Sequence, residues 1–436
     1  MRMMAEARMG LAALLFASVA LASGAQAQAT DGYITYHMEP GDTLISVQQR
    51  FLKRGDSLAA ITRLNRITNV RRIPVGTRLL LPRDLLAWRP AGLVVRSFSG
   101  PVTIDGAAPV IGAPLSEGAV IRTGAGGFVT FQSPDGAAIA LPSNSHARLE
   151  RARVYALRDL RDVEFRILNG RGEVQAPTLR GDERFRTSTP VAVTAVRGTE
   201  YRVSFDEASG LGTTEVIEGA VWVERSEDER LTGEGYGIAA REAGLSAPEL
   251  LLPPAAIAAP GAVQTEEVVA FAVTPPPGAQ ESRTQIARDA GFLEMLAEDV
   301  SADGDTVFSR LEDGRYFVRA RGIAASGVEG LSETFSFRRK RLGVEATVEA
   351  SPLADGFRFA WLPQGEGVTH FAFQLWREGE AATPLYDELA LPGSATVITG
   401  LAPGTYIWRV AAIQADAEEG LLKVWGPEQS LTVSPE

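Results

Sequence analysis

Short alternating runs of apolar and polar residues, separated by glycine-containing turns, dominate the chain from residue 93 to about residue 225. One such run is Phe128 to Phe131, and another is Val163 to Ile167. Pro134-Asp135-Gly136 and Asn169-Gly170 are turn signals between such runs. Alternation with a period of two is typical of half-buried β-strands. The pattern predicts an all-β domain over 93–245, folded as a sandwich or roll whose sheets share one core.

An internal repeat with a period near 90 residues occupies the C-terminal part of the chain. The repeated residues are Leu311, Gly314, Tyr316 and Arg319 in the first copy, and Leu401, Gly404, Tyr406 and Arg409 in the second. A period of this size corresponds to one sandwich domain per copy. We therefore expect two β-sandwiches, over 265–340 and 342–436. The proline- and alanine-rich stretch that precedes them, 246–264, is expected to be a semi-rigid spacer.

Residues 33–83 show helical spacing between two short strand-like runs. Ile34 and Tyr36 alternate with polar neighbours, which suits a strand, and Gly41 permits a turn after it. Apolar residues at spacings of three and four then indicate two helices, with Leu44, Val47 and Phe51 in the first and Leu58, Ile61 and Leu64 in the second. With a return strand over 77–81, the pattern predicts a small β-α-α-β module. For the whole chain it predicts a mainly β, multidomain fold.

The module at 33–83 resembles the LysM family of glycan-binding modules. The matching residues are Gly41-Asp42-Thr43-Leu44, Leu64-Asn65-x-Ile67 and Ile73-x-x-Gly76-x-x-Leu79-x-Leu81-Pro82. The resemblance implies a shallow groove between the loop after the first strand and the loop before the last. There, backbone groups would bind the acetamido substituents of an N-acetylglucosamine-containing glycan, so the partner implied is peptidoglycan. The glycan-binding residues implied are Gly41, Asp42, Thr43, Leu44, Ile67, Asn69, Val70 and Ile73.

Two adjacent arginines, Arg71 and Arg72, make the second loop of this groove basic. They either favour an anionic glycan or are simply solvated. We expect them to be solvated, because charged surface residues usually are.

The middle domain resembles the periplasmic domain of ferric-citrate-type transmembrane regulators, the FecR family. The resemblance rests on Ile121-Arg122-Thr123-Gly124, on Ser133-Pro134-Asp135-Gly136, and above all on the run AVRGTEYRV over 195–203. It implies an all-β fold and an envelope location. A regulatory role, in which this domain contacts a membrane signalling protein of the envelope, is therefore one alternative for the function.

The two repeats resemble fibronectin type III or related immunoglobulin-like domains. The run from Gly400 to Val410 would place Tyr406 near a tyrosine corner. Three tryptophans in predicted strands are expected in the cores rather than in a sugar-stacking platform: Trp361, Trp376 and Trp408. The basic run 338–341, between the repeats, is expected to be a solvated hinge.

Residues 1–29 are expected to be a secretory signal peptide. Arg2 and Arg8 form a basic start, an apolar run of 13 residues extends from Gly10 to Ala22, and Ala25-Gln26-Ala27 offers a cleavage site. The run is shorter than the ~20 residues that span a bilayer, and no later run reaches that length. We therefore expect export to the periplasm and cell envelope, with no transmembrane segment in the mature chain.

The composition excludes several classes of function. The chain contains no cysteine, so disulfides, thiol catalysis and thiolate metal sites are excluded. Its formal net charge of −11 argues against nucleic acid as a partner, because phosphate binding requires a basic face. The histidines, His37, His146 and His370, fall in three different predicted domains, so we expect no metal site and no cofactor.

We predict that the protein is not an enzyme, because the sequence contains no recognisable catalytic motif. A pair of carboxylates that hydrolyses a glycan leaves no local signature, so a hydrolase with a cryptic carboxylate site is a second alternative. The prediction we favour is a non-catalytic envelope protein. It would bind peptidoglycan through 33–83 and present β domains to a partner protein.

Overall fold

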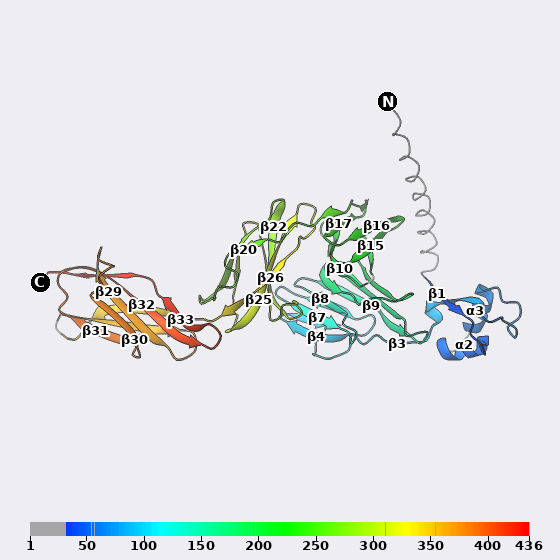
Figure 1. Ribbon diagram of the computed structural model, residues 1–436, viewed down its shortest axis with the longest axis horizontal. Helices are drawn as coiled ribbons and strands as arrows, with labels where there is room; N and C mark the ends of the chain where they lie inside the picture. Colours follow the sequence, from blue (N-terminus) through cyan, green and yellow to red (C-terminus); the bar gives the residue numbers. More distant parts are fainter. Residues whose placement is uncertain are drawn as a thin grey trace, which may run out of the picture.

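A computed structural model describes residues 32–53, 55, 57–196, 198–309, 311–353 and 355–435. The predicted signal peptide, 1–29, lies outside the described residues. Four units follow one another along the long axis of the molecule (Figure 1). We call them the N-terminal module (33–86), the barrel (88–250), the first sandwich (256–339) and the second sandwich (343–433). The mainly β, multidomain fold that the sequence predicts is confirmed.

The N-terminal module has the predicted β-α-α-β order. Its elements are β1 (Tyr33–His37), α2 (Leu44–Phe51), α3 (Ser57–Leu64) and β2 (Arg78–Pro82), followed by the short 3-10 helix η1 (Arg83–Leu85). β1 and β2 form an antiparallel ladder in which Tyr36 lies opposite Leu79. The predicted apolar stripes face inward, because Leu44, Val47 and Ile61 are all buried beneath the helices.

The barrel is built from β-strands, as the alternating pattern predicts, but the strands close on themselves instead of forming a sandwich or roll. Among the described residues, one of the strand pairs is parallel and the others are antiparallel. Its strands are β3 (Trp88–Pro90), β4 (Val94–Ser99), β5 (Val102–Ile104), β6 (Val120–Thr123), β7 (Phe128–Gln132), β8 (Ala138–Leu141), β9 (His146–Tyr155), β10 (Arg161–Gln175), β11 (Arg184–Ser188), β12 (Val193–Val196), β13 (Glu200–Asp206), β14 (Leu211–Glu218), β15 (Ala220–Arg225), β16 (Asp228–Gly233), β17 (Tyr236–Arg241), β18 (Gly244–Leu245) and β19 (Glu249–Leu250).

The long strand β10 explains how the barrel closes. Its first part pairs with β9 and β11, and its second part pairs with β8 and β13. One strand thus belongs to both halves of the barrel wall, and apolar side chains from both halves fill a single core. Phe131, Phe165 and Tyr201 are fully buried in it.

The N-terminal module is packed directly on the barrel. Leu86 shares an apolar cluster with Tyr155, Leu157 and Leu160 of the barrel. Arg83 is buried at this junction, and its Nη2 donates to the backbone oxygen of Asp182 at 2.6 Å. The two units are therefore joined by a side-chain interface as well as by the chain.

The first sandwich has one sheet with the order β20-β21-β24 and a second with the order β23-β22-β25-β26. The strands are β20 (Ala256–Ile257), β21 (Val269–Thr274), β22 (Ala279–Ala287), β23 (Met295–Ser301), β24 (Asp305–Phe308), β25 (Gly314–Ala324) and β26 (Glu333–Arg339).

The second sandwich repeats this arrangement, with the order β27-β28-β31 in one sheet and β30-β29-β32-β33 in the other, where β34 also pairs with β32. The strands are β27 (Gly343–Ala350), β28 (Gly356–Gln364), β29 (His370–Arg377), β30 (Tyr386–Leu391), β31 (Ala395–Thr399), β32 (Gly404–Asp416), β33 (Gly420–Trp425) and β34 (Gln429–Val433).

Two details of the sandwiches confirm predictions from the repeat. The hydroxyl of Tyr406 donates to the backbone oxygen of Ala402 at 2.7 Å, and Tyr316 makes the same bond to Glu312 at 3.0 Å. This is the hydrogen bond of a tyrosine corner, and it is present in both copies. The three tryptophans are core residues, as expected: Trp361, Trp376 and Trp408 are each at most 6% exposed.

The proline- and alanine-rich stretch 246–264 differs from the spacer that the sequence suggests. Its first part forms β19 of the barrel, and its later part forms β20 of the first sandwich. Between them Leu251 is buried, and the backbone oxygen of Leu252 accepts a hydrogen bond from Leu331 at 2.8 Å. The stretch belongs to both units because proline and alanine permit an extended backbone. This backbone pairs with β17 of the barrel and with β21 of the first sandwich.

The basic run 338–341 also corrects an expectation, because it is not a solvated hinge. Arg339 is 2% exposed and its Nη1 donates to the backbone oxygen of Gln264 at 2.9 Å. Arg338 forms an ion pair of 2.9 Å with Asp416 of the second sandwich. Lys340 donates to the backbone oxygen of Glu366, also in the second sandwich, at 2.8 Å. The charges of this run join the two sandwiches.

The junction between the sandwiches should loosen in acid. The hydrogen bond from Arg338 lowers the pKa of Asp416 to about 2. Because the folded-state pKa lies below the ordinary one, this carboxylate stabilises the junction above about pH 4, and that contribution is lost as the pH falls towards 2. We expect small-angle scattering to show a wider range of angles between the sandwiches over this interval. Arg338→Gln should show that range already at pH 7, and identical profiles for both proteins would contradict the assignment.

Candidate functional site

The two loops expected to form a glycan groove leave the β1–β2 ladder at the same end. His37, the last residue of β1, lies opposite Arg78, the first residue of β2. Two further backbone hydrogen bonds extend the ladder past this pair, from Met38 to Thr77 (3.0 Å) and from Gly76 to Met38 (2.7 Å). The loops containing Gly41 to Leu44 and Ile67 to Ile73 therefore start from neighbouring points.

The first loop is held in place by hydrogen bonds to the carboxylate of Asp42. Asp42 accepts hydrogen bonds from the Tyr36 hydroxyl, from Arg50 and from the backbone of Glu39. Burial alone would raise the pKa of Asp42, but the hydrogen bonds from Tyr36 and Glu39 and the charge of Arg50 lower it. The carboxylate is thus ionised, and it fixes the turn.

The next two residues of this loop begin α2. Thr43 caps the helix: its Oγ1 accepts from Ser46 N at 3.0 Å, and its own N–H donates to Ser46 Oγ at 2.9 Å. Leu44 is buried in the module core. The side chains of Asp42, Thr43 and Leu44 therefore stabilise the loop. Gly41, at φ +87°, is exposed and has open space around it.

The second loop divides into buried ends and an exposed middle. Ile67 and Ile73 are half-buried and pack against the module core. Asn69 is exposed, and its Oδ1 accepts from the backbone of Arg71 at 3.0 Å. Val70 is 45% exposed. Of the residues predicted in this loop, Asn69 and Val70 are the ones whose side chains a ligand can reach.

Sequence reasoning missed two exposed apolar residues beside these loops. Ile45, in the first turn of α2, is 58% exposed, and Val75, between the second loop and β2, is 63% exposed. A signal for Ile45 was available, because it lies off the buried stripe of Leu44, Val47 and Phe51. An apolar residue on the wrong face of a helix is a candidate contact for a ligand.

An open hollow of about 800 Å³ lies on the same module, along α3, and α2 contributes Gln48 to it. Its lining includes Gln48, Thr62, Arg63, Arg66, Ile67 and Thr68. Ile67 is the one predicted glycan residue that lines it. The other predicted glycan-binding residues lie on the same module but do not line this hollow.

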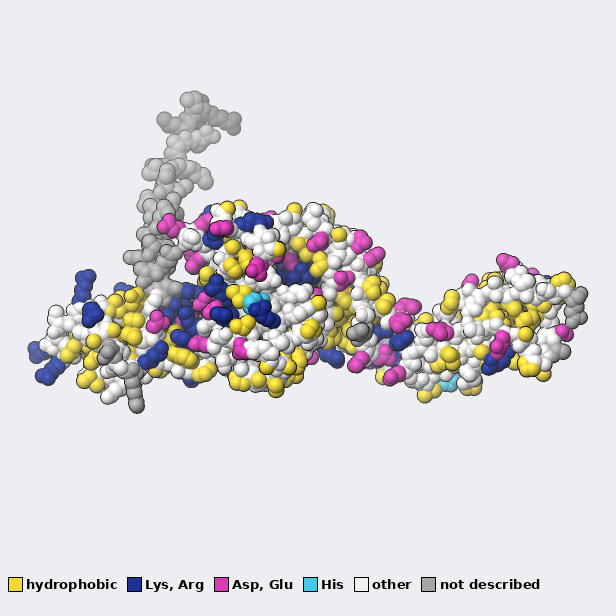
Figure 2. Space-filling model, turned by 180° about the vertical axis from the view of Figure 1, so that it is seen from behind, with side chains coloured by type: hydrophobic (Ala, Val, Ile, Leu, Met, Phe, Trp, Pro, Cys, Tyr) yellow, Lys and Arg dark blue, Asp and Glu magenta, His cyan; other side chains and the backbone are white. Residues whose placement is uncertain are grey.

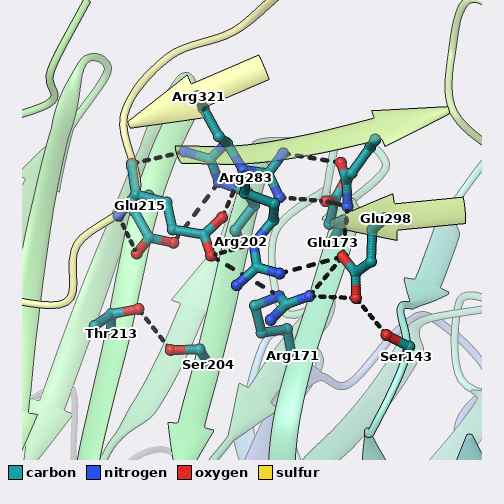
Figure 3. A network of polar contacts seen from close by, with 12 residues as sticks. Ser143, Arg171, Glu173, Arg202, Ser204, Thr213, Glu215, Arg283, Glu298 and Arg321 are labelled. Atoms are coloured by element: carbon teal, nitrogen blue, oxygen red, sulfur yellow. Dashed lines mark hydrogen bonds and ion pairs between the residues drawn. The ribbon is translucent and has the colours of Figure 1, made fainter. Parts of the chain in front are cut away.

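A second candidate site lies where the barrel meets the first sandwich (Figure 3). Arginines and glutamates from the barrel face arginines and glutamates from the sandwich across the junction. The barrel residues are Arg171 and Glu173 of β10, Arg202 of β13 and Glu215 of β14. The sandwich residues are Arg283 of β22, Glu298 of β23, Arg319 and Arg321 of β25, and Glu329. We call these nine residues the charge network.

Ion pairs and hydrogen bonds in the charge network cross the junction. Arg171 pairs with Glu298 at 2.8 Å, and Glu173 pairs with Arg321 at 2.8 Å. Arg202 donates to the backbone oxygen of Glu329, also at 2.8 Å. These partners are more than 100 residues apart in the chain. No local pattern could have identified them.

Burial and the neighbouring opposite charges shift the pKa values of the network in opposite directions. Burial would raise the pKa of Glu173, but Arg319 and Arg321 hold it well below its ordinary value. Burial lowers the pKa of Arg202 to about 10, which still leaves it charged at neutral pH. Burial raises the pKa of Glu215, and that group is only 2% exposed.

A polar hollow of about 610 Å³ opens beside the charge network. Arg171, Arg283, Glu298 and Glu329 contribute to its lining. Arg171 pairs with Glu298 and Glu329 across the junction, and Arg283 pairs with the same two glutamates within the first sandwich. The arrangement is suited to holding two domains in a fixed orientation.

The protein is thus a mainly β, multidomain chain whose first module has the β-α-α-β order. Residues 36–82 match the model of the LysM domain, and residues 119–222 match the model described as FecR protein. Both are binding or regulatory modules rather than catalytic ones, and both are typical of the bacterial envelope. No curated protein matches the sequence.

Several solved structures are similar to parts of the chain. A crystal structure of a candidate anti-sigma factor from Parabacteroides distasonis is 19% identical, with a TM-score of 0.26, and the match covers 30% of this chain and 59% of that one. The FN1–FN3 domains of chicken CNTN1 are 10% identical, with a TM-score of 0.24 and coverage of 54% and 98%. A segment of two fibronectin type III domains from chicken tenascin is 11% identical, with a TM-score of 0.22 and coverage of 42% and 99%.

Proposed function

We propose that this protein is a non-catalytic component of the cell envelope that binds peptidoglycan through residues 33–83. The observation that carries the proposal is the match of 36–82 to the LysM domain. The geometry supports it, because two loops leave one end of the β1–β2 ladder side by side. The barrel and sandwiches would then be presented to a partner protein of the envelope.

The first loop is suited to recognition by its backbone. Asp42 and Thr43 direct their side chains into the turn and the helix cap, so the loop keeps one conformation before any ligand binds. A preorganised loop loses little conformational entropy on binding. Exposed Asn69 and Val70 in the second loop would supply the facing contacts.

An envelope location agrees with the predicted signal peptide, and export does not require disulfides in a chain that can build several cores. Within the described ranges, no helix is both long and apolar enough to cross a membrane. We propose the periplasm as the compartment.

Co-sedimentation with isolated peptidoglycan tests the proposal. We expect the full chain to pellet with a Kd on the order of 0.1–1 mM, as for one shallow site. Gly41→Val should lose about tenfold or more in binding, because a β-branched residue is strained at φ +87° and distorts the loop. Gly112→Val is the matched control, since Gly112 has φ +79° and open space in a barrel loop. Equal pelleting by both variants would contradict the proposed site.

A regulatory role is the second candidate, and the match of 119–222 to FecR protein favours it. In that case the barrel would contact a membrane signalling protein. A pull-down from envelope extract distinguishes the two: recovery of a signalling protein supports regulation, whereas recovery of wall material alone supports anchoring.

The carboxylates of the charge network give little support to the hydrolase alternative. A general acid needs a raised pKa and access to its substrate. Glu215 has a raised pKa, but it is buried beneath the junction, and Glu173, Glu298 and Glu329 are held ionised by arginines. Release of soluble fragments from peptidoglycan by the purified protein would overturn the non-catalytic proposal.

A further inference from the structure

The charge of the N-terminal module is opposite to that of the whole chain. Residues 33–83 contain nine lysines and arginines and three acidic residues, a net charge of +6. The whole chain carries −11, so the other residues together carry −17. Most of the protein would be repelled by an anionic polymer, whereas this module would be attracted to one.

Four arginines concentrate this charge on one part of the module. Arg63, Arg66, Arg71 and Arg72 are exposed, and among the described residues none of them has an ion-pair partner. Figure 2 shows dark blue side chains projecting at the N-terminal end of the molecule. By contrast, Arg50 of the same module is paired with Asp42.

Two of these arginines line the hollow along α3. Arg63 and Arg66 contribute charge, Thr62, Thr68 and Gln48 contribute hydrogen-bonding groups, and the hollow measures about 800 Å³. A volume of this size is ordinary for the site of a small ligand. The two arginines and the hydrogen-bonding groups beside them suit a negatively charged ligand.

Arg66 occupies a backbone position that favours glycine. After α3 the chain makes a Schellman turn, in which Ile67 N donates to Thr62 O (3.0 Å) and Arg66 N donates to Arg63 O (3.2 Å). Arg66 is the left-handed residue of this turn, with φ +53°. Glycine or asparagine is usual there, so an arginine works against the local backbone preference. Departures of this kind from local preference are expected at functional positions.

We propose that this hollow binds the carboxylates of the stem peptides of peptidoglycan while the neighbouring loops hold the glycan strand. The inference rests on the proposed glycan-binding function, and Ile67, which belongs to both regions, makes the two sites continuous. A membrane surface is the other source of negative charge. The hollow favours the peptide because its lining contains no aromatic side chain of the kind that enters a bilayer interface.

The test compares three insoluble ligands for the full-length protein. Native sacculi carry stem-peptide carboxylates, sacculi coupled to ethanolamine with a carbodiimide carry neutral amides in their place, and chitin offers uncharged N-acetylglucosamine alone. We expect native sacculi to bind roughly tenfold more tightly than amidated sacculi. About 0.5 M salt should remove most of that difference.

Two variants separate the role of the charge from that of the fold. Arg66→Gly removes the charge and relieves the left-handed strain, so its unfolding temperature should be unchanged or higher while its preference for native sacculi is lost. Arg63→Gln should lose the preference as well. Arg78→Gln is the matched control, because it removes the same charge from the same module at a position outside the hollow.

The outcomes distinguish this inference from the function on which it rests. Failure to bind both sacculi and chitin would overturn the glycan-binding proposal and the inference with it. Equal binding to native and amidated sacculi, or an equal loss in Arg78→Gln and Arg66→Gly, would overturn the inference alone. Tighter binding to vesicles of anionic phospholipid than to native sacculi would also overturn it, in favour of a membrane ligand.

Discussion

Replacing Glu329 with glutamine is expected to lower the free energy of unfolding of the barrel and first sandwich by about 3–5 kcal/mol. Its two carboxylate oxygens accept from Arg283 Nε at 2.9 Å and from Arg321 Nε at 2.5 Å. All three residues are buried. Without the carboxylate, two buried guanidinium groups would remain charged and would each lose an ionised hydrogen-bond partner. Urea unfolding followed by circular dichroism measures the change.

The matched control for this substitution is Glu418→Gln. Glu418 also pairs with an arginine of the first sandwich, Arg315, at 2.6 Å, but both side chains are more than 40% exposed. An exposed pair contributes only about 0.2–1 kcal/mol. If the two variants unfold at the same urea concentration, the buried ion pairs of Glu329 do not stabilise the fold, and the structural role assigned to the charge network is wrong.

Replacing Asn65 with alanine is expected to unfold the N-terminal module and to abolish binding to peptidoglycan. Asn65 Nδ2 donates to the backbone oxygens of Ile61 and Leu80, both at 3.0 Å, and its Oδ1 accepts from Leu80 N at 2.7 Å. This one side chain joins the end of α3 to β2. Its loss leaves backbone groups without partners, at a cost of about 2–4 kcal/mol. A module of roughly 50 residues has little stability to lose.

Hydrogen exchange measures this effect directly, because the amides of α3 and β2 should lose protection in the Asn65→Ala variant. Asn69→Ala is the control: Asn69 is exposed and caps one loop turn, so the module should remain protected while binding weakens. Protection of α3 that survives in the Asn65→Ala variant would show that the helix is held by its apolar face alone.

Local patterns predicted those parts of the fold that local physics determines. The spacing of Leu44, Val47 and Phe51 predicted α2, because a helix buries residues three and four apart. The 90-residue repeat predicted two sandwiches, and Tyr406 predicted the corner that the structure contains. In each case the residues that interact are close in sequence or recur at a fixed period.

Contacts between distant residues were not predictable in the same way. Arg338 and Asp416 are far apart in the chain. A run of four basic residues is predicted to be exposed to solvent when its acidic partners are not known. The same holds for the charge network, whose pairs join the barrel to the first sandwich. At the candidate site, the sequence indicated the two loops. It did not show that Asp42 and Thr43 are engaged within them, or that Arg63 and Arg66 line a hollow.

The strands formed by the stretch 246–264 have a mechanical consequence. β19 belongs to the barrel and β20 to the first sandwich, with Leu251 buried between them, so no slack chain separates the two units. Side-chain interfaces also join the N-terminal module to the barrel and one sandwich to the next. A pull on either end would therefore be transmitted through folded domains rather than taken up by an extensible tether. A protein held to the wall by residues 33–83 would therefore keep its last sandwich at a fixed distance from the wall.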